Sequence, residues 1–110
     1  NGKTWSFLSR PVPDTGEGNP PSLVRLSDGR LCLINCHRTT PYQLEARLSG
    51  DDGKTWTEPI ILRDDLGGRD IGYVRSIVRP DGKVVSVYYL HVKGDPTRFI
   101  GATIWDPGSR

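Results

Sequence analysis

Apolar residues recur at every second position in several short stretches of this chain of 110 residues. Such alternation over four to eight residues is typical of β-strands with one buried face. The pattern predicts strands over residues 6–11, 22–26, 31–36, 43–48, 57–62, 73–78, 84–90 and 99–105. No long apolar stripe with the helical period is present, so the sequence predicts an all-β fold.

Two Asp-Gly pairs connect neighbouring predicted strands. One pair begins at Asp28 and the other at Asp81, so they are 53 residues apart. Asp-Gly between two apolar runs is a strong hairpin signal. Residues 13–21 are rich in proline and glycine instead, and this composition predicts a loop.

A third turn is predicted over residues 49–56, between two further alternating runs. The side chains of Ser49 and Asp51 can bond turn amides, and Gly53 allows a positive φ. Trp56 supplies a large apolar body that can anchor the turn. The stretch therefore predicts strand, tight turn and strand.

Residues 1–5 match residues 52–56 except that Asn1 stands in place of Asp52, and the two copies are 51 residues apart. A period near 50 residues is typical of four-stranded propeller blades. We therefore expect residues 1–110 to form a single unit. Its predicted parts are an outer strand of a blade over residues 1–11, a first blade over 12–66, and a second blade over 67–110 that lacks its last strand.

Hydrophobic residues make up 35% and charged residues 25% of the chain, which are values of a soluble globular domain. The formal charge of +2 is small and scattered, so we expect neither a nucleic acid nor a membrane as partner. No apolar run is long enough to span a membrane, and the first residues lack the pattern of a signal peptide. We expect a cytoplasmic protein, or a secreted one whose targeting segment has been removed.

Cys32 and Cys36 lie four residues apart in one predicted strand. At about 3.3 Å per residue they are separated by roughly 13 Å, which is too far for a disulfide. His37 is adjacent, but there is no second cluster of cysteine and histidine as a zinc site requires. The sequence predicts buried thiols, no metal site and no cofactor.

Residues 49–56 resemble the Asp-box of sialidases and related β-propellers, Ser-x-Asp-x-Gly-x-Thr-Trp, at every fixed position. In that family the box is a structural turn away from the catalytic pocket. Residues 19–107 resemble the C-terminal two blades of bacterial sialidase-like proteins with BNR repeats. The stretches that carry this likeness are residues 18–23, 46–49, 70–73 and 100–107.

The resemblance implies two four-stranded blades of a six-bladed sialidase-like β-propeller. Propellers close with about 4–8 blades, so two blades do not form a ring. Three chains would supply six, with each N-terminal strand completing the last blade of a neighbour. The homotrimer and a monomer or dimer with some other closure both remain open.

The resemblance also implies candidate site residues. Sialidases use a tyrosine nucleophile paired with a glutamate, an acid/base aspartate and three arginines that hold the sugar carboxylate. Tyr73 matches the place of that tyrosine, at the start of the first strand of a blade. Arg38 and Arg47 are candidates for an arginine near the third strand, and Arg75 shares the strand face of Tyr73.

No residues match the Phe/Tyr-Arg-Ile-Pro motif of the family, and neither Glu45 nor Glu58 is identified as the partner of Tyr73. We expect Asp70 to be a loop ion-pair partner or a cap. One hypothesis is an exo-α-sialidase-like glycosidase that acts on a glycan. The alternatives are a non-catalytic module that binds a carbohydrate or a protein through its central face, and a stable piece with no separate function.

Overall fold

The computed structural model describes residues 1–109, so Arg110, the last residue of the predicted second blade, lies outside the described part. It contains seven strands: β1 Ser22–Arg25, β2 Leu31–His37, β3 Gln43–Ser49, β4 Ile60–Arg63, β5 Gly72–Val78, β6 Val84–Leu90 and β7 Phe99–Trp105. Within residues 1–109 there is no helix, so the all-β prediction is confirmed. In particular, that part of the chain has no helix that could cross a membrane.

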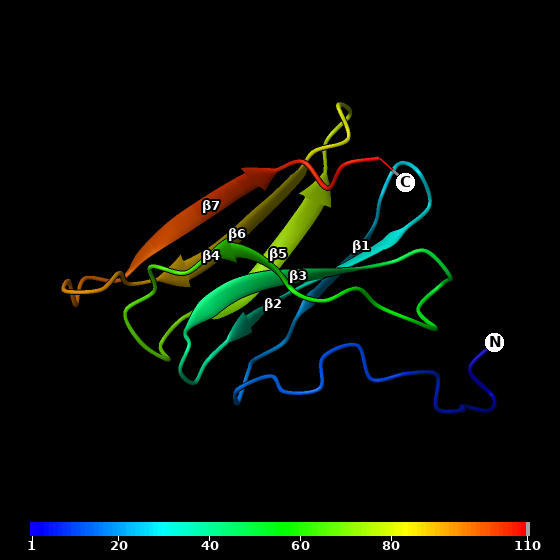
Figure 1. The fold of residues 1–110 in the computed structure, drawn as a ribbon, viewed down its shortest axis with the longest axis horizontal. Helices are drawn as coiled ribbons and strands as arrows, with labels where there is room; N and C mark the ends of the chain where they lie inside the picture. The colour runs from blue at the N-terminus through cyan, green and yellow to red at the C-terminus, as the bar shows by residue number, and fades with distance from the viewer. Residues whose placement is uncertain (110) are drawn as a thin grey trace.

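The strands form two antiparallel sheets. The first sheet has the order β1-β2-β3-β4 and the second has the order β5-β6-β7. β1 and β2 of the first sheet both contact β5 of the second sheet. Residues 1–21 contain no strand. The N-terminal part of this segment runs along the first sheet on the side away from the second sheet (Figure 1), and Asn19 near its end contacts the start of β5. The chain is therefore built in three layers.

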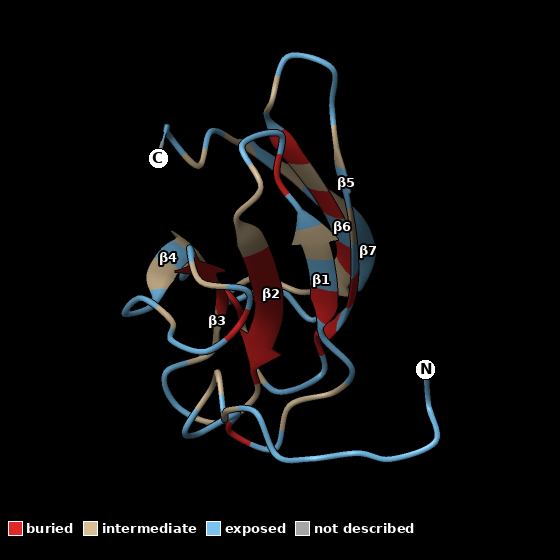
Figure 2. Ribbon diagram, turned by 90° about the vertical axis from the view of Figure 1, so that its right-hand side faces the viewer, coloured by how far each residue is buried: buried red, intermediate tan, exposed pale blue. Residues whose placement is uncertain are grey.

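The hydrophobic core lies between the two sheets. From the first sheet, Ile34 and Leu44 are fully buried, and from the second sheet so are Val74, Val84 and Leu90. Buried positions therefore concentrate on β2, β3 and one side of β6 (Figure 2). Alternate residues of each strand point to opposite faces, so the predicted period of two selects the side chains that enter this core.

The two Asp-Gly hairpins have the same geometry. In the first, the Leu26 N–H donates to the Arg30 carbonyl at 2.8 Å. In the second, the Arg79 N–H donates to the Lys83 carbonyl at 2.8 Å. Both glycines have positive φ, 92° and 85°. The 53-residue spacing in the sequence is therefore a repeat in the structure.

The turn over residues 49–56 is held by its own side chains, as predicted. The Ser49 hydroxyl accepts the Gly53 N–H at 2.8 Å and donates to the Asp51 carboxylate at 2.9 Å. The same carboxylate accepts the N–H and the hydroxyl of Thr55. These bonds, the Thr55 hydroxyl foremost, lower the pKa of Asp51 to about 2. The Trp56 indole N–H donates to the Gly53 carbonyl at 3.1 Å.

Two predicted strands differ from the observed ones. The fourth strand begins at Ile60 and not at residue 57, because Pro59 has no N–H with which to continue the ladder. Residues 6–11, predicted as an outer strand, do not form one. Instead, Ser9 contacts the turn over residues 49–56: its hydroxyl donates to the Gly53 carbonyl and accepts the Trp56 indole N–H.

Cys32 and Cys36 are free and fully buried, as the strand spacing predicted. Burial raises the pKa of each thiol to about 12, so both remain protonated at neutral pH. They pack as small apolar side chains in the core.

We expect Leu44→Ala to lower the free energy of unfolding by about 2–5 kcal/mol, because Leu44 is fully buried and its truncation opens a cavity in the core. Leu23→Ala is the matched control. Leu23 is 58% exposed, so its truncation should change stability by less than about 0.5 kcal/mol. Urea denaturation measures both, and equal losses would contradict the placement of the core.

The turn over residues 49–56 should make stability depend on pH at the acid end. The pKa of Asp51 falls from its ordinary 3.8 to about 2 on folding, so its carboxylate stabilises the fold above pH 4. This contribution is lost as the pH falls from about 4 to about 2. The difference in stability between wild type and Asp51→Asn should therefore shrink over that range. A difference that stays constant from pH 7 to pH 2 would count against this role.

Candidate functional site

The start of β5 has an unusual backbone. Gly72 has a φ of 125° and Tyr73 has a φ of 50°. The pairing of β5 with β6 shifts register between Gly72 and Arg75, so the strand bulges at Tyr73. A positive φ is uncommon for a bulky residue and costs on the order of 1–3 kcal/mol, and such strain gathers at functional sites. Tyr73 is therefore a candidate functional residue.

The side chain of Asn19 holds this backbone in place. Its Nδ2 donates to the Ile71 carbonyl at 3.0 Å, and its Oδ1 accepts the Tyr73 N–H at 3.2 Å. A Cβ atom at Gly72 would lie 2.3 Å from the Asn19 amide, so only glycine fits between the two contacts. Asn19 therefore clamps the start of β5 from the loop that precedes β1.

The clamp presents the Tyr73 ring beside Tyr89 of β6. The two rings are stacked, with centroids 6.0 Å apart and planes at 24°. Tyr73 is 57% exposed, whereas Tyr89 is partly buried. Aromatic rings at this separation attract each other, which favours the observed position of the Tyr73 ring. We call this pair the aromatic platform; it is accessible through Tyr73.

Charged groups border the platform. The Tyr89 hydroxyl donates to Asp70 at 2.9 Å, and the Arg98 Nε donates to the other oxygen of the same carboxylate at 2.9 Å. Arg98 foremost, and then Tyr89, lowers the pKa of Asp70. Desolvation, followed by the Asp70 carboxylate, raises the pKa of Tyr89. Around pH 7 the border therefore consists of a charged carboxylate, a charged guanidinium and a neutral phenol.

Arg38, a predicted substrate-binding residue, belongs to this cluster. It follows β2, and its Nε donates to the Arg69 carbonyl at 2.7 Å. Its charge acts to lower the pKa of Tyr89 against the larger effect of desolvation. Arg69 itself pairs with Glu17 at 3.1 Å through largely exposed side chains. The structure thus brings Arg38 to the same end of the sheets as Tyr73.

The other two predicted arginines have different surroundings. Arg75 is exposed and borders an apolar hollow of about 190 Å³. The prediction that it shares the strand face of Tyr73 assumed a regular strand, whereas the register of β5 shifts between Gly72 and Arg75. Arg47 does not reach the surface. Its side chain is 9% exposed and pairs with Glu45 at 2.6 Å. The hypothesis that Arg47 binds substrate is therefore not supported by its position, because the alternation of β3 directs it to the covered outer face of the first sheet.

The carboxylates do not pair with Tyr73 as the sialidase resemblance requires. Glu45 is 2% exposed and accepts bonds from Asn35, Gln43 and Arg47. Desolvation opposes its ionisation, but these donors together lower the pKa of Glu45. In the cluster, Asp70 accepts a hydrogen bond from Tyr89 and not from Tyr73.

Sequence reasoning missed three residues of the site, namely Asn19, Tyr89 and Arg98. Asn19 lies in a loop whose composition signals only a turn, and Tyr89 lies in a nearly continuous apolar strand. Asp70 was predicted as an ion-pair partner and is one, with Arg98.

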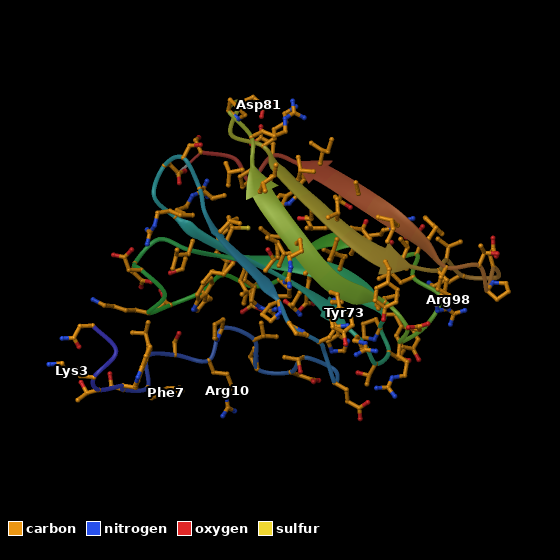
Figure 3. The ribbon with its side chains drawn as sticks, turned by 180° about the vertical axis from the view of Figure 1, so that it is seen from behind. Lys3, Phe7, Arg10, Tyr73, Asp81 and Arg98 are labelled. Carbon is orange, nitrogen blue, oxygen red and sulfur yellow. The ribbon has the colours of Figure 1, made fainter. Side chains whose placement is uncertain are left out.

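Figure 3 shows Tyr73 and Arg98 toward one end of the second sheet, with Asp81 at the other. Within residues 1–109 no three or more of His, Cys, Asp and Glu are grouped to hold a metal ion.

No family model and no curated protein matches this chain. Among solved structures, a protein of unknown function from Dyadobacter fermentans DSM 18053 is similar, with a TM-score of 0.67 and 32% sequence identity. The match covers 79% of this chain and 24% of that protein. This chain therefore spans about a quarter of the length of its structural neighbour.

We expect Asn19→Ala to release the start of β5. The Tyr73 N–H loses its acceptor, so its hydrogen exchange should become at least about tenfold faster, consistent with the loss of one hydrogen bond. Asn19→Asp keeps the acceptor oxygen and should have a smaller effect. NMR-detected exchange measures both, with the Val85 amide as reference. Unchanged exchange at Tyr73 in Asn19→Ala would contradict the clamp.

Proposed function

We propose that the cluster around Tyr73 binds a glycan, and that the two sheets are two blades of a propeller of sialidase-like lineage. One observation carries the first part: Tyr73 is exposed, yet its backbone is strained and clamped by Asn19. A sugar ring presents C–H groups on its faces and hydroxyls around its edge. The exposed Tyr73 ring suits a sugar face, and Asp70, Arg98 and Arg38 suit the hydroxyls.

Preorganisation supports binding at this place. The Tyr73 side chain is restricted before any ligand arrives, by the Asn19 bond to its N–H and by its contact with Tyr89. Less conformational entropy is then lost when a ligand binds. The charges nearby are also positioned in advance, because Asp70 holds Arg98 and Tyr89 at the border of the platform.

The propeller assignment is supported by the repeat. The two hairpin turns have the same hydrogen bonds, and the turn over residues 49–56 has the side-chain bonds that its sequence pattern implies. The innermost strands of the two sheets, β1 and β5, contact each other. The structural neighbour is about four times longer than the matched part, which leaves room there for several more sheets of this kind.

Hydrolysis is the second candidate function, with Tyr73 as nucleophile in an exo-α-sialidase-like reaction. Its support is the place of Tyr73 at the start of β5, together with Arg38 nearby. Binding without turnover is favoured because Asp70 is committed to Tyr89 and Arg98, and Glu45 is buried with Arg47. A tyrosine nucleophile needs a carboxylate that polarises its own hydroxyl.

Substitutions at Tyr73 separate the two functions. Tyr73→Phe keeps the ring, so glycan affinity should change by less than about threefold, whereas Tyr73→Ala should weaken it at least about tenfold. NMR titration with sialyllactose and with neutral lactose measures both variants. Arg38→Ala should weaken binding of sialyllactose more than of lactose, and Arg79→Ala, at the opposite hairpin, is its control.

A fluorogenic sialoside tests turnover in the same proteins. The binding hypothesis expects no turnover by the wild type. If the wild type turns over the sialoside, and Tyr73→Phe abolishes turnover but keeps glycan affinity, the protein is a hydrolase and the binding hypothesis is wrong. If neither sugar shifts the resonances of Tyr73 and Tyr89 at millimolar concentration, glycan binding by this chain is refuted.

A further inference from the structure

A hollow of about 260 Å³ lies next to the candidate site. We call it the side hollow, and its charged and titratable lining residues are His91, Asp95 and Arg98. The Nε of Arg98 donates to Asp70, which borders the aromatic platform. Figure 3 shows Arg98 and Tyr73 toward the same end of the second sheet. The side hollow is thus linked to the platform through Arg98 and Asp70.

Two segments that are distant in the sequence form the walls of the side hollow. One is the loop between β6 and β7, residues 91–98, and the other is the connection from β4 to β5 (Figure 1). Leu66 of the connection forms a β-bridge with Val92 of the loop. The Gly67 N–H also donates to the His91 carbonyl at 2.8 Å. Backbone hydrogen bonds therefore join the two walls to each other.

The imidazole of His91 packs against the backbone of Gly67 and Gly68. A Cβ atom at Gly67 would lie 2.5 Å from the His91 Nδ1, and one at Gly68 would lie 3.2 Å from the Nε2. The ring fits in this place because neither residue has a side chain. Within residues 1–109 neither ring nitrogen has a hydrogen-bond partner. Packing therefore holds the ring, and its nitrogens remain able to bond a ligand.

The two charged residues of the side hollow are held by bonds within the loop. The Asp95 carboxylate accepts the Thr97 N–H at 2.9 Å, and this bond, foremost, lowers the pKa of Asp95. The Nη1 of Arg98 donates to the Pro96 carbonyl at 2.6 Å. A small number of positioned polar groups in a hollow is the usual composition of a small-molecule binding site.

Sugar hydroxyls match this combination of groups. A hydroxyl both donates and accepts hydrogen bonds, so it can bond a carboxylate, a guanidinium or an imidazole. An anionic ligand would instead face Asp95, and an apolar one would leave the polar groups unpaired. Asp70 lies between Arg98 and the aromatic platform. The side hollow and the platform are therefore separate places, suited to two neighbouring rings of one ligand.

We propose that the side hollow is a second sugar subsite, which takes the neighbouring ring of a glycan whose first ring lies on Tyr73. The proposal rests on the glycan binding proposed above and specifies its ligand, an oligosaccharide of two or more rings. His91 bonds a hydroxyl of the second ring, and Arg98 lies where the two rings meet. The second ring gains affinity because the groups that receive it are already in position.

NMR titration of the full chain with methyl β-galactoside, which has one ring, and with lactose, which has two, tests the subsite. Both sugars should shift the amide resonances of Tyr73 and Tyr89. Only lactose should also shift those of Gly67, Val92 and Gly94, which line the side hollow. Lactose should bind at least about threefold more tightly than methyl β-galactoside, consistent with added hydrogen bonds to the second ring.

Substitution of His91 tests its role in the subsite. His91→Ala should weaken lactose binding at least about threefold and leave the affinity for methyl β-galactoside unchanged. His91→Gln keeps hydrogen-bonding groups and should lose less affinity. Lys93→Ala is the matched control, because Lys93 is exposed on the same loop and does not line the side hollow. Circular dichroism checks the fold of each variant.

Three results would each overturn the second subsite while glycan binding at Tyr73 stands. They are equal affinities of the wild type for the two sugars, lactose shifts confined to Tyr73 and Tyr89, and a His91→Ala variant that binds lactose normally or weakens both sugars equally. If neither sugar shifts the resonances of Tyr73 and Tyr89, the proposed function and the second subsite are both wrong.

Discussion

The structure depends on the burial of one apolar face of each sheet against the other. Ile34 and Leu44 from the first sheet and Val84 and Leu90 from the second form a common core with no exposed surface. Apolar burial of this kind is the dominant stabilising contribution in a protein of this size. A sheet has two faces, however, and this contact covers only one face of each.

The outer faces of the two sheets differ in composition and burial. That of the first sheet carries Glu45, Arg47 and Asn35, which lie buried on the side along which the N-terminal segment runs. A buried ion pair is tolerated there because the carboxylate also accepts amide hydrogen bonds. The outer face of the second sheet is open and mostly apolar, with Ile77, Val87 and Ile104 exposed beside Arg75. This asymmetry gives the molecule two unlike surfaces.

The candidate site arises where the loop before β1 meets the start of β5. Asn19 is distant from Tyr73 in sequence, yet its two hydrogen bonds hold the strained backbone that presents the ring. The backbone that presents Tyr73 therefore depends on a contact between the two halves of the chain, whereas Asp70, Tyr89 and Arg98 interact within the second half. Disturbing the packing of the sheets would be expected to disturb the site as well.

The sequence by itself determined the seven observed strands, the hairpins and the turn over residues 49–56, although it also predicted a strand over residues 6–11 that does not form. These are local: alternation selects the buried side of a strand, and Asp28, Gly29, Ser49 and Asp51 act on residues a few positions away. Only the tertiary structure decided that Arg47 is buried, that Asp70 bonds Tyr89, and that Asn19 clamps Tyr73. Each depends on which residues meet across sheets and loops, and local patterns carry no information on such distant contacts.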